Sequence, residues 1–157
     1  MKRCIELALK GAGRVAPNPM VGSVLVHDGR IIGEGFHEFY GGPHAEVNCV
    51  RSVAQEDEHL VSLSTLYVSL EPCAHYGKTP PCTELILNKK IPAVVVGCTD
   101  PFDAVNGKGI GILRAAGVEA EAGVLEAECK ALNRRFFFSV QEQRPYVILK
   151  WAATANG

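Results

Sequence analysis

Two short apolar runs constrain the fold of this chain more than any other feature of its sequence. TLYVSL (65–70) and AVVVGC (93–98) contain no charged residue. The first predicts a short, largely apolar strand, and the second is typical of a strand covered on both faces of a parallel sheet. Residues 80–90, between them, open with prolines and close with lysines, as helices do. Residues 23–37 hold two strand-like runs around Asp28-Gly29, a strong hairpin signal. Strands that alternate with helices predict a three-layer α/β/α fold with a central mixed, mostly parallel sheet.

Composition and breaking residues mark the remaining elements. We expect a short strand at 118–123, and helices at residues 2–12, 44–55 (beginning near His44), 107–117 and 125–141, the last as one long helix. Ligand sites in such sheets lie beyond the carboxyl ends of the strands. The segment after the strand at 65–70 is therefore the first place to look for a site.

Composition narrows the class of partner. The chain has 157 residues, 47% of them apolar and 21% charged, which fits one globular domain. The formal net charge is −1, with 16 basic and 17 acidic residues, whereas a nucleic-acid binder normally has a basic excess. No apolar run approaches the ~18 residues of a membrane span. We therefore expect a small-molecule partner, with neither nucleic acid nor membrane.

Six cysteines permit disulfides but do not require them. The N-terminal segment does not have the pattern of a secretory signal, because Glu6 and Lys10 interrupt its apolar part. We therefore expect a cytoplasmic protein with reduced cysteines. Four of the six lie among aliphatic residues and are expected to be small buried core residues: Cys4, Cys49, Cys98 and Cys129.

The other two cysteines belong to a pattern that predicts a metal site. His44-Ala45-Glu46 begins one expected helix, and Cys73 and Cys82 flank the start of the next. One imidazole and two thiolates are good zinc ligands, and three ligands leave a fourth position open, as in catalytic sites. A bound zinc lowers the pKa of its water from ~15.7 towards ~7. Glu46, two residues after His44, would be the general acid/base of a zinc deaminase, whose signature combines H-x-E with P-C and a second cysteine.

Three other interpretations stay open at this point. The H-x-E and P-C pairs, taken singly, occur by chance in many helices and loops. A structural zinc site would need a fourth ligand, for which His75 is the candidate. A disulfide between Cys73 and Cys82 would instead predict a clipped binding protein without metal.

The whole pattern resembles the deaminase domain of the bacterial riboflavin-biosynthesis deaminase/reductase, which has the cytidine-deaminase-like fold. The most specific match is the long cysteine loop PCAHYGKTPPC (72–82), where other deaminases have two residues between the cysteines. The resemblance covers nearly the whole chain through shorter matches: PNPMVG (17–22), GPHAE (42–46), GKGI (107–110), LN (132–133) and RPYV (144–147). One departure is Phe102, where the family often has Asn, so the family's contacts from that loop are not carried over.

The resemblance implies a substrate, 2,5-diamino-6-ribosylamino-4(3H)-pyrimidinone 5′-phosphate, whose 2-amino group would be hydrolysed to a carbonyl. It implies that His44, Cys73 and Cys82 hold one zinc ion, with Glu46 as the catalytic residue. It also implies that His75 and Lys78 contact substrate, Lys78 near the phosphate. An ordinary solvated lysine is the alternative for Lys78.

Two further residues are candidate substrate contacts because of where they lie in the sequence. Asn18 lies in a turn bracketed by prolines, from which its amide could reach the ring or the ribose, and His37 follows the expected hairpin. A turn asparagine and a structural histidine are the respective alternatives. The predicted substrate-binding set is therefore Asn18, His37, His75 and Lys78.

The end of the chain predicts a domain boundary. RPYVILKWAATANG (144–157) reads as a new strand and resembles the start of the family's NADPH-dependent reductase. We expect a deaminase domain at 1–143 and, at 144–157, the first strand of a second domain rather than an edge strand of the same sheet. The resemblance also makes a homo-oligomer possible.

Competing functions have distinct signatures. A deaminase of cytosine, a nucleotide or a tRNA adenosine would share the fold, but the tRNA enzymes would have the short cysteine spacing and a basic face. A non-catalytic zinc domain that serves in assembly would not need Glu46.

Overall fold

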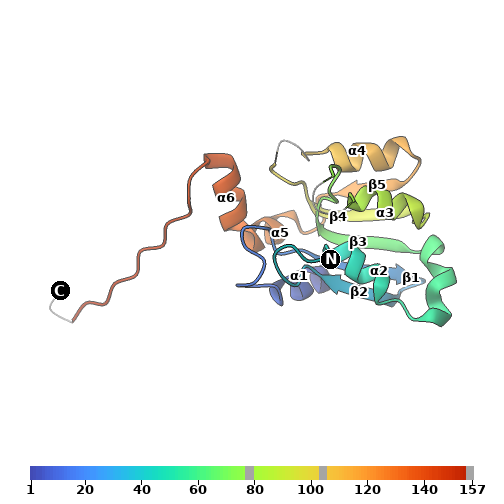
Figure 1. Ribbon diagram of the computed structural model, residues 1–157, viewed down its shortest axis with the longest axis horizontal. Coiled ribbons are helices and arrows are strands. Elements are labelled where there is room, and N and C mark those ends of the chain that lie inside the picture. Colours follow the sequence, from blue (N-terminus) through green and yellow to red (C-terminus); the bar gives the residue numbers. More distant parts are fainter. Residues whose placement is uncertain (77–79, 103–105, 155–157) are drawn as a thin grey trace.

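A computed structural model describes residues 1–76, 80–102 and 106–154, and it places a five-stranded sheet at the centre of the molecule (Figure 1). The strand order is β2-β1-β3-β4-β5. The strands are β1 (Gly22–His27), β2 (Arg30–Phe36), β3 (Thr65–Leu70), β4 (Ala93–Cys98) and β5 (Glu119–Ala122). The hairpin and the strands at 65–70 and 93–98 are confirmed.

The hairpin β1–β2 turns at Asp28 and Gly29, which both have positive φ, 46° and 76°. Such a turn matches the right-handed twist of the flanking strands, which is why Asp-Gly is a strong hairpin signal. β1 pairs antiparallel with β2 and with β3, while β3, β4 and β5 are parallel. Four strands therefore run in one direction and β1 runs against them, which confirms a mixed, mostly parallel sheet.

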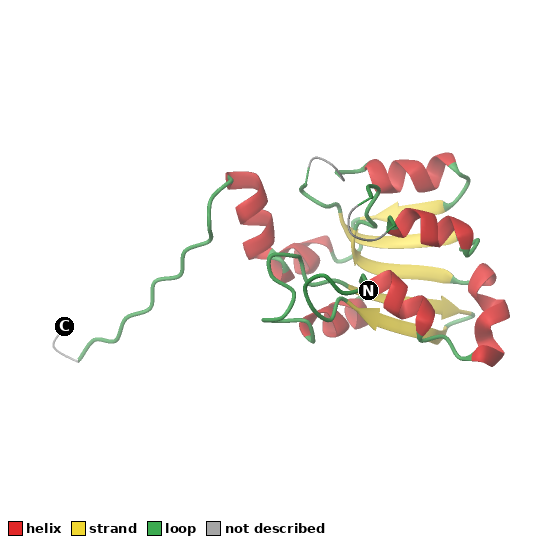
Figure 2. Cartoon of the chain, in the orientation of Figure 1, coloured by secondary structure: helices red, strands yellow, loops and turns green. Residues whose placement is uncertain are grey.

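Helices cover both faces of the sheet (Figure 2). One face carries α2 (Ala45–Arg51), α3 (Cys82–Asn88) and α4 (Lys108–Ala115). The other face carries α1 (Lys2–Leu9) and α5 (Glu126–Leu132). A 3₁₀ segment, η1 (Gln55–Leu63), leads into β3 and was not expected from the sequence. The predicted three-layer α/β/α architecture is confirmed.

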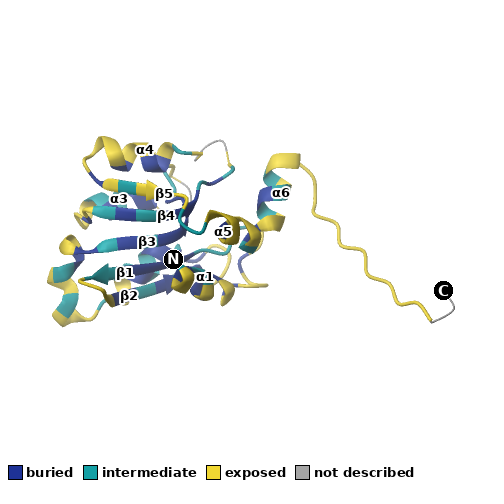
Figure 3. Cartoon of the chain, turned by 180° about the vertical axis from the view of Figure 1, so that it is seen from behind, coloured by how far each residue is buried: buried dark blue, intermediate teal, exposed yellow. Residues whose placement is uncertain are grey.

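Buried residues form separate hydrophobic clusters on the two faces of the sheet, whose strands are coloured largely as buried or intermediate in Figure 3. Leu25, Leu66 and Val94 pack in the larger cluster, under α2, α3 and α4. Val24 packs instead with Cys4 and Leu7 of α1. Because successive side chains of a strand point to opposite faces, neighbouring residues such as Val24 and Leu25 serve different layers. The four cysteines expected in the core are buried, and all six cysteines are free thiols.

The expectation of one long helix at 125–141 is wrong. The structure has two helices there, α5 and α6 (Arg134–Glu142), which meet at Asn133. The backbone of Asn133 leaves the helical conformation, with φ −107° and ψ 22°. Its side chain hydrogen-bonds to the backbone of Met20, and this tertiary contact coincides with the break in the helical run.

Residues 145–154 form neither helix nor strand and leave the body of the molecule as an exposed extended segment (Figure 1). They make no strand pairing with the central sheet. The prediction that residues 144–157 begin a second domain stays a prediction. Across the described parts of the chain, none of the helices is both long and apolar enough to cross a membrane.

Candidate metal centre

The site lies where β3 and β4 end. Because these two strands are parallel, the loops that follow Leu70 and Cys98 lie at the same edge of the sheet. β1 runs in the opposite direction, so the segment that enters β1 at Gly22 lies at this edge too. Segments that are distant in the sequence therefore meet beyond the strand ends, as expected for a sheet of this class.

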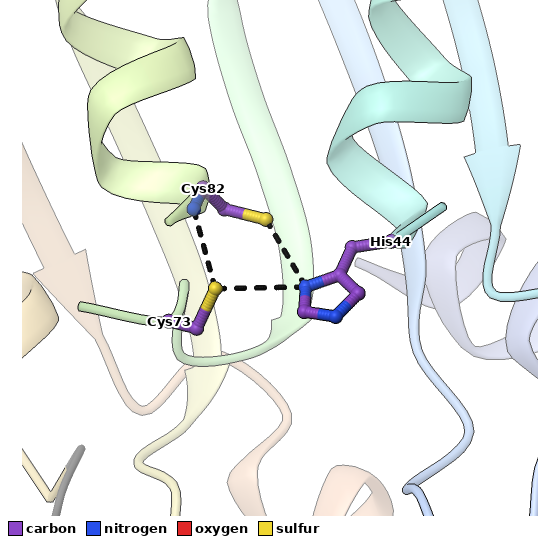
Figure 4. Close-up of side chains that lie close together, drawn as sticks. All are labelled: His44, Cys73 and Cys82. Carbon is purple, nitrogen blue, oxygen red and sulfur yellow. Dashed lines mark hydrogen bonds between the residues drawn. The ribbon is translucent and has the colours of Figure 1, made fainter. Parts of the chain in front are cut away.

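The first turns of two helices hold two of the three predicted metal ligands. His44 is the N-cap residue of α2, Cys82 is the first residue of α3, and the third ligand, Cys73, lies in the loop after β3. Figure 4 shows the three side chains pointing toward one another. The Nδ1 atom of His44 lies 3.5 Å from the Cys73 Sγ and 3.3 Å from the Cys82 Sγ. The backbone N–H of Cys82 donates to the Cys73 Sγ at 3.2 Å.

This geometry fits a zinc ion. One potential ligand atom from each of the three residues lies within 4.8 Å of the others, and an imidazole nitrogen with two sulfurs is a donor set that zinc prefers. In the described part of the chain, the cluster has no fourth member. His75, the candidate for a fourth ligand of a structural site, is exposed and outside the cluster. The open side favours a catalytic over a structural arrangement.

The protonation of the cluster favours negative charge on sulfur. Hydrogen bonds from Cys82 and His44 lower the pKa of the Cys73 thiol, although burial opposes them. The pKa of Cys82 is raised, because its thiol donates to Cys73 and is buried. The hydrogen bond to Cys73 raises the pKa of His44 to about 8. The three groups thus share protons that a divalent cation would displace.

Glu46 lies in the first turn of α2 and is 3% exposed. Burial raises the pKa of its carboxyl above the usual range. Glu46 lines the same cavity as His44 and Cys73 but is not part of the ligand cluster. A buried carboxyl next to a metal site, but free of it, is suited to accept and release a proton.

Three of the four predicted substrate residues line one cavity of about 440 Å³ together with Glu46. Asn18 donates from Nδ2 to the Nε2 of His37 at 3.1 Å, so the Nδ1 of His37 is the donor to the carbonyl of Pro43, at 3.0 Å. Burial lowers the pKa of His37, which agrees with a neutral ring. His75 also lines the cavity, whereas Lys78 lies outside the described residues.

Sequence reasoning missed two carboxylates at this edge. Glu71 accepts hydrogen bonds from the backbone N–H groups of Asp100 at 3.2 Å, Gly107 at 2.8 Å and Ile110 at 3.2 Å. It thereby ties Asp100 and the start of α4 to the segment that follows β3 and carries Cys73, here called the metal loop. Asp100 lines the cavity, and burial raises its pKa to about 6. Both carboxylates follow the end of a buried strand closely, and this position is the signal that could have found them.

Phe102 and helix α6 also line the cavity, and the sequence did not predict either contribution. Phe102, the departure from the family pattern, lines the cavity with its ring centroid 6.3 Å from that of His75. α6 contributes Phe136, Ser139 and Val140. Nothing in the local sequence of α6 indicates that it reaches the site, because its position depends on the break at Asn133.

Comparisons with known proteins agree with this geometry. Residues 1–98 match the family model described as the cytidine and deoxycytidylate deaminase zinc-binding region. The chain belongs to this zinc-binding deaminase family.

Relatives extend the similarity over the whole chain. It is 48% identical over 157 residues to the chloroplastic riboflavin biosynthesis protein PYRD of Zea mays, covering 100% of this chain and 39% of that protein. A crystal structure of a diaminohydroxyphosphoribosylaminopyrimidine deaminase/5-amino-6-(5-phosphoribosylamino)uracil reductase from Thermotoga maritima is 52% identical, with a TM-score of 0.92 over 100% of this chain and 44% of that one. The chain spans about two fifths of the curated relatives' length.

A fungal structure provides a second comparison. The Rib2 deaminase of Aspergillus oryzae, in complex with DARIPP, is 25% identical with a TM-score of 0.66, and the match covers 90% of this chain and 91% of that one. The cytidine-deaminase-like fold expected from the sequence is thereby confirmed.

Proposed function

We propose that this chain is the deaminase of a riboflavin-biosynthesis enzyme, and that it hydrolyses the 2-amino group of 2,5-diamino-6-ribosylamino-4(3H)-pyrimidinone 5′-phosphate. Water and the C–NH₂ group of the ring give a carbonyl and ammonia. The observation that carries the proposal is one cavity that joins Glu46 to the His44–Cys73–Cys82 cluster. The similarity of the whole chain to riboflavin-biosynthesis proteins supports this substrate.

His44, Cys73 and Cys82 would hold one zinc ion through Nδ1 and two Sγ atoms. When bound, zinc would act as a Lewis acid and make hydroxide available near neutral pH. Cys73 is held for this role by the backbone N–H of Cys82, so the two sulfurs stay on one side of the imidazole.

Glu46 moves the proton in this proposal. Its buried carboxylate takes a proton from the attacking water and passes it to the amino nitrogen, which leaves as ammonia. The position of Glu46 on the cavity wall, next to two ligands but outside the cluster, supports this role. The amide of the substitution Glu46→Gln could hydrogen-bond the water but could not carry its proton.

Asn18, His37 and His75 would orient the substrate. The first two form a joined, partly buried polar wall, suited to the ring or the ribose, while His75 is exposed at the cavity. Among the described lining residues there is neither lysine nor arginine. Lys78 therefore remains the proposed partner of the substrate phosphate, for which a cation is suited.

Three further proposals concern the whole protein. Residues 1–143 would form the deaminase domain and residues 144–157 the first strand of a reductase domain, which alone would need NADPH. The small phosphorylated pyrimidine would be the partner, in the cytoplasm, without nucleic acid or membrane. A homo-oligomer is a further possibility that the family resemblance raises.

The test is ammonia release from the diaminopyrimidinone ribosyl phosphate by zinc-loaded protein, with Glu46→Gln alongside. We expect Glu46→Gln to lower kcat by about 10³-fold, the middle of the range for a lost general acid/base, while zinc content stays at one per chain. Release from cytosine, deoxycytidylate or tRNA, but not from this substrate, would favour another deaminase. Full activity of Glu46→Gln would contradict the role of Glu46.

A further inference from the structure

Asn133 joins the break between α5 and α6 to a segment 113 residues earlier in the chain. The side chain is 4% exposed. Its Oδ1 accepts from the backbone N–H of Met20 at 2.8 Å, and its Nδ2 donates to the backbone carbonyl of Met20 at 2.8 Å. Only an amide satisfies both groups at this length. Asp would face the carbonyl with a second acceptor, and Ala would leave the N–H and the carbonyl of the half-buried Met20 without this partner.

The segment that Asn133 holds has few donors of its own. Pro17 and Pro19 lack a backbone N–H. Asn18 donates its backbone N–H to Val15 at 2.9 Å, at the start of the segment, and at its end the carbonyl of Val21 accepts from the backbone N–H of His37 at 2.9 Å. Between these anchors, Asn133 fixes the backbone at Met20. Asn133 thus holds the backbone two residues after Asn18.

A series of hydrogen bonds continues from this segment into the site. The Asn18 amide contacts the His37 ring at 3.1 Å, and the His37 ring contacts the carbonyl of Pro43 at 3.0 Å. Pro43 directly precedes His44. Asn18 and His37 both face the cavity that Glu46 lines. A shift at Met20 would therefore displace the polar side chains of this cavity wall.

Asn133 itself does not line that cavity. It lines a neighbouring cavity of about 620 Å³, which shares with the site cavity the residues Pro17, Asn18, Phe136 and Ser139. Asn133 therefore does not touch a ligand in the site cavity directly, and the shared wall, which includes Asn18, connects the two cavities.

We propose that Asn133 is a positioning residue for the deamination, which fixes Met20 so that Asn18 and His37 face the bound ring. The proposal rests on the function proposed above. It predicts that the substrate is bound less well without Asn133, while the metal cluster is intact.

The kinetic test compares the wild type with Asn133→Ala in the whole chain. We expect KM to rise about 10-fold, because a small misplacement of groups that position a substrate, caused by a change far from the chemistry, can cost up to about 10²-fold, with zinc content unchanged. Ser64→Ala is the matched control. It removes the hydrogen bond from the Oγ of the buried Ser64 to the carbonyl of Leu60, at 2.7 Å, just before β3 begins and so at the opposite end of that strand from the site. Its KM should equal that of the wild type. An unchanged KM in Asn133→Ala overturns the proposal.

A double-mutant cycle separates positioning from a general loss of stability. In an Asn18→Ala background, Asn133→Ala should change KM by less than about 2-fold, because the residue through which it acts is already gone. The same factor in both backgrounds would mean that Asn133 does not act through Asn18, and the proposal would fail.

A third measurement does not depend on the substrate. Nitrogen-15 NMR of the His37 ring reports the hydrogen bond from Asn18 to Nε2. We expect its Nε2 signal to shift in Asn133→Ala, and to stay in Ser64→Ala. If Asn133→Ala does not fold, Asn133→Asp, which keeps the acceptor for the Met20 N–H, takes its place. A wild-type signal would overturn the proposal even if the protein were shown to act on another substrate.

Discussion

The Asp100 carboxyl lies at the cavity wall, where burial raises its pKa to about 6. A carboxyl with a raised pKa in the folded state binds its proton more tightly there than in the unfolded chain, where the pKa is about 3.9. Below about pH 4 the carboxyl is protonated in both states, and the fold keeps its full stability. As the pH rises through about 6, the buried carboxyl ionises and the free energy of unfolding falls.

The substitution Asp100→Asn removes this ionisation but keeps an Oδ1 acceptor for the backbone N–H of Phe102, 2.8 Å away. We expect it to raise the free energy of unfolding relative to the wild type by up to about 2 kcal/mol at pH 8, and by much less at pH 4. Urea unfolding of both proteins at the two pH values, with a chelator present throughout, measures this. An equal difference at both pH values would contradict the assignment.

At the scale of elements, α4 packs unusually close to the metal loop. A Cβ on Gly109 would overlap the carbonyl oxygen of Pro72 and lie 3.2 Å from a Glu71 carboxylate oxygen. Helix α4 would have to move away, which would strain the hydrogen bonds from Gly107 and Ile110 to Glu71.

Two substitutions on α4 separate this contact from helix propensity. Gly109→Ala should destabilise the protein by about 2 kcal/mol, as overpacking does. Gly111→Ala has nothing within 4 Å of the new Cβ and should stabilise it by about 0.5–1 kcal/mol, because alanine favours the helix. Chemical denaturation of both variants is the measurement. If both Gly109→Ala and Gly111→Ala raised the free energy of unfolding, α4 would not need to pack closely against Pro72 at Gly109.

The elements also show how far sequence reasoning reaches. The strands at 65–70 and 93–98 were predictable because apolar runs without charge are a local signal. The cluster of His44, Cys73 and Cys82 was predictable because the residue types themselves carry metal-binding chemistry. The break at Asn133 was not, because its cause is a contact with Met20 that is visible only in three dimensions. The same holds for Glu71 and for the α6 wall, whose partners lie on other elements.

At the scale of the whole molecule, the metal cluster joins α2, α3 and the loop after β3. A ligand that binds the folded state alone stabilises it by RT ln(1 + [L]/Kd), about 4 kcal/mol at a thousandfold excess over Kd. We expect zinc to raise Tm and a chelator to reverse the rise. Cys82→Ser should abolish this response to zinc. Cys49 is buried but outside the cluster, so Cys49→Ser should lower Tm while Tm still rises on addition of zinc. A zinc response that survives Cys82→Ser would place the metal elsewhere.

The exposed C-terminal segment gives the last prediction. Leu149 and Trp151 are each 79% exposed, next to Val147 and Ile148 at 66% and 57%, and a contiguous run of exposed apolar side chains is typical of an interaction surface. Where the segment leaves α6, the ring of Phe138 meets that of Tyr146 edge-on at 5.3 Å, and the Arg144 guanidinium lies over the Phe138 ring. If residues 144–157 belong to a second folding unit, removal of residues 147–157, which keeps these contacts with α6, should leave Tm, zinc content and ammonia release unchanged. Trp151 is the chain's single tryptophan, so its emission in the full chain should be as red-shifted as that of a free tryptophan derivative, before and after unfolding. A fall in Tm on truncation, or a blue-shifted emission, would show instead that the segment packs on the deaminase body.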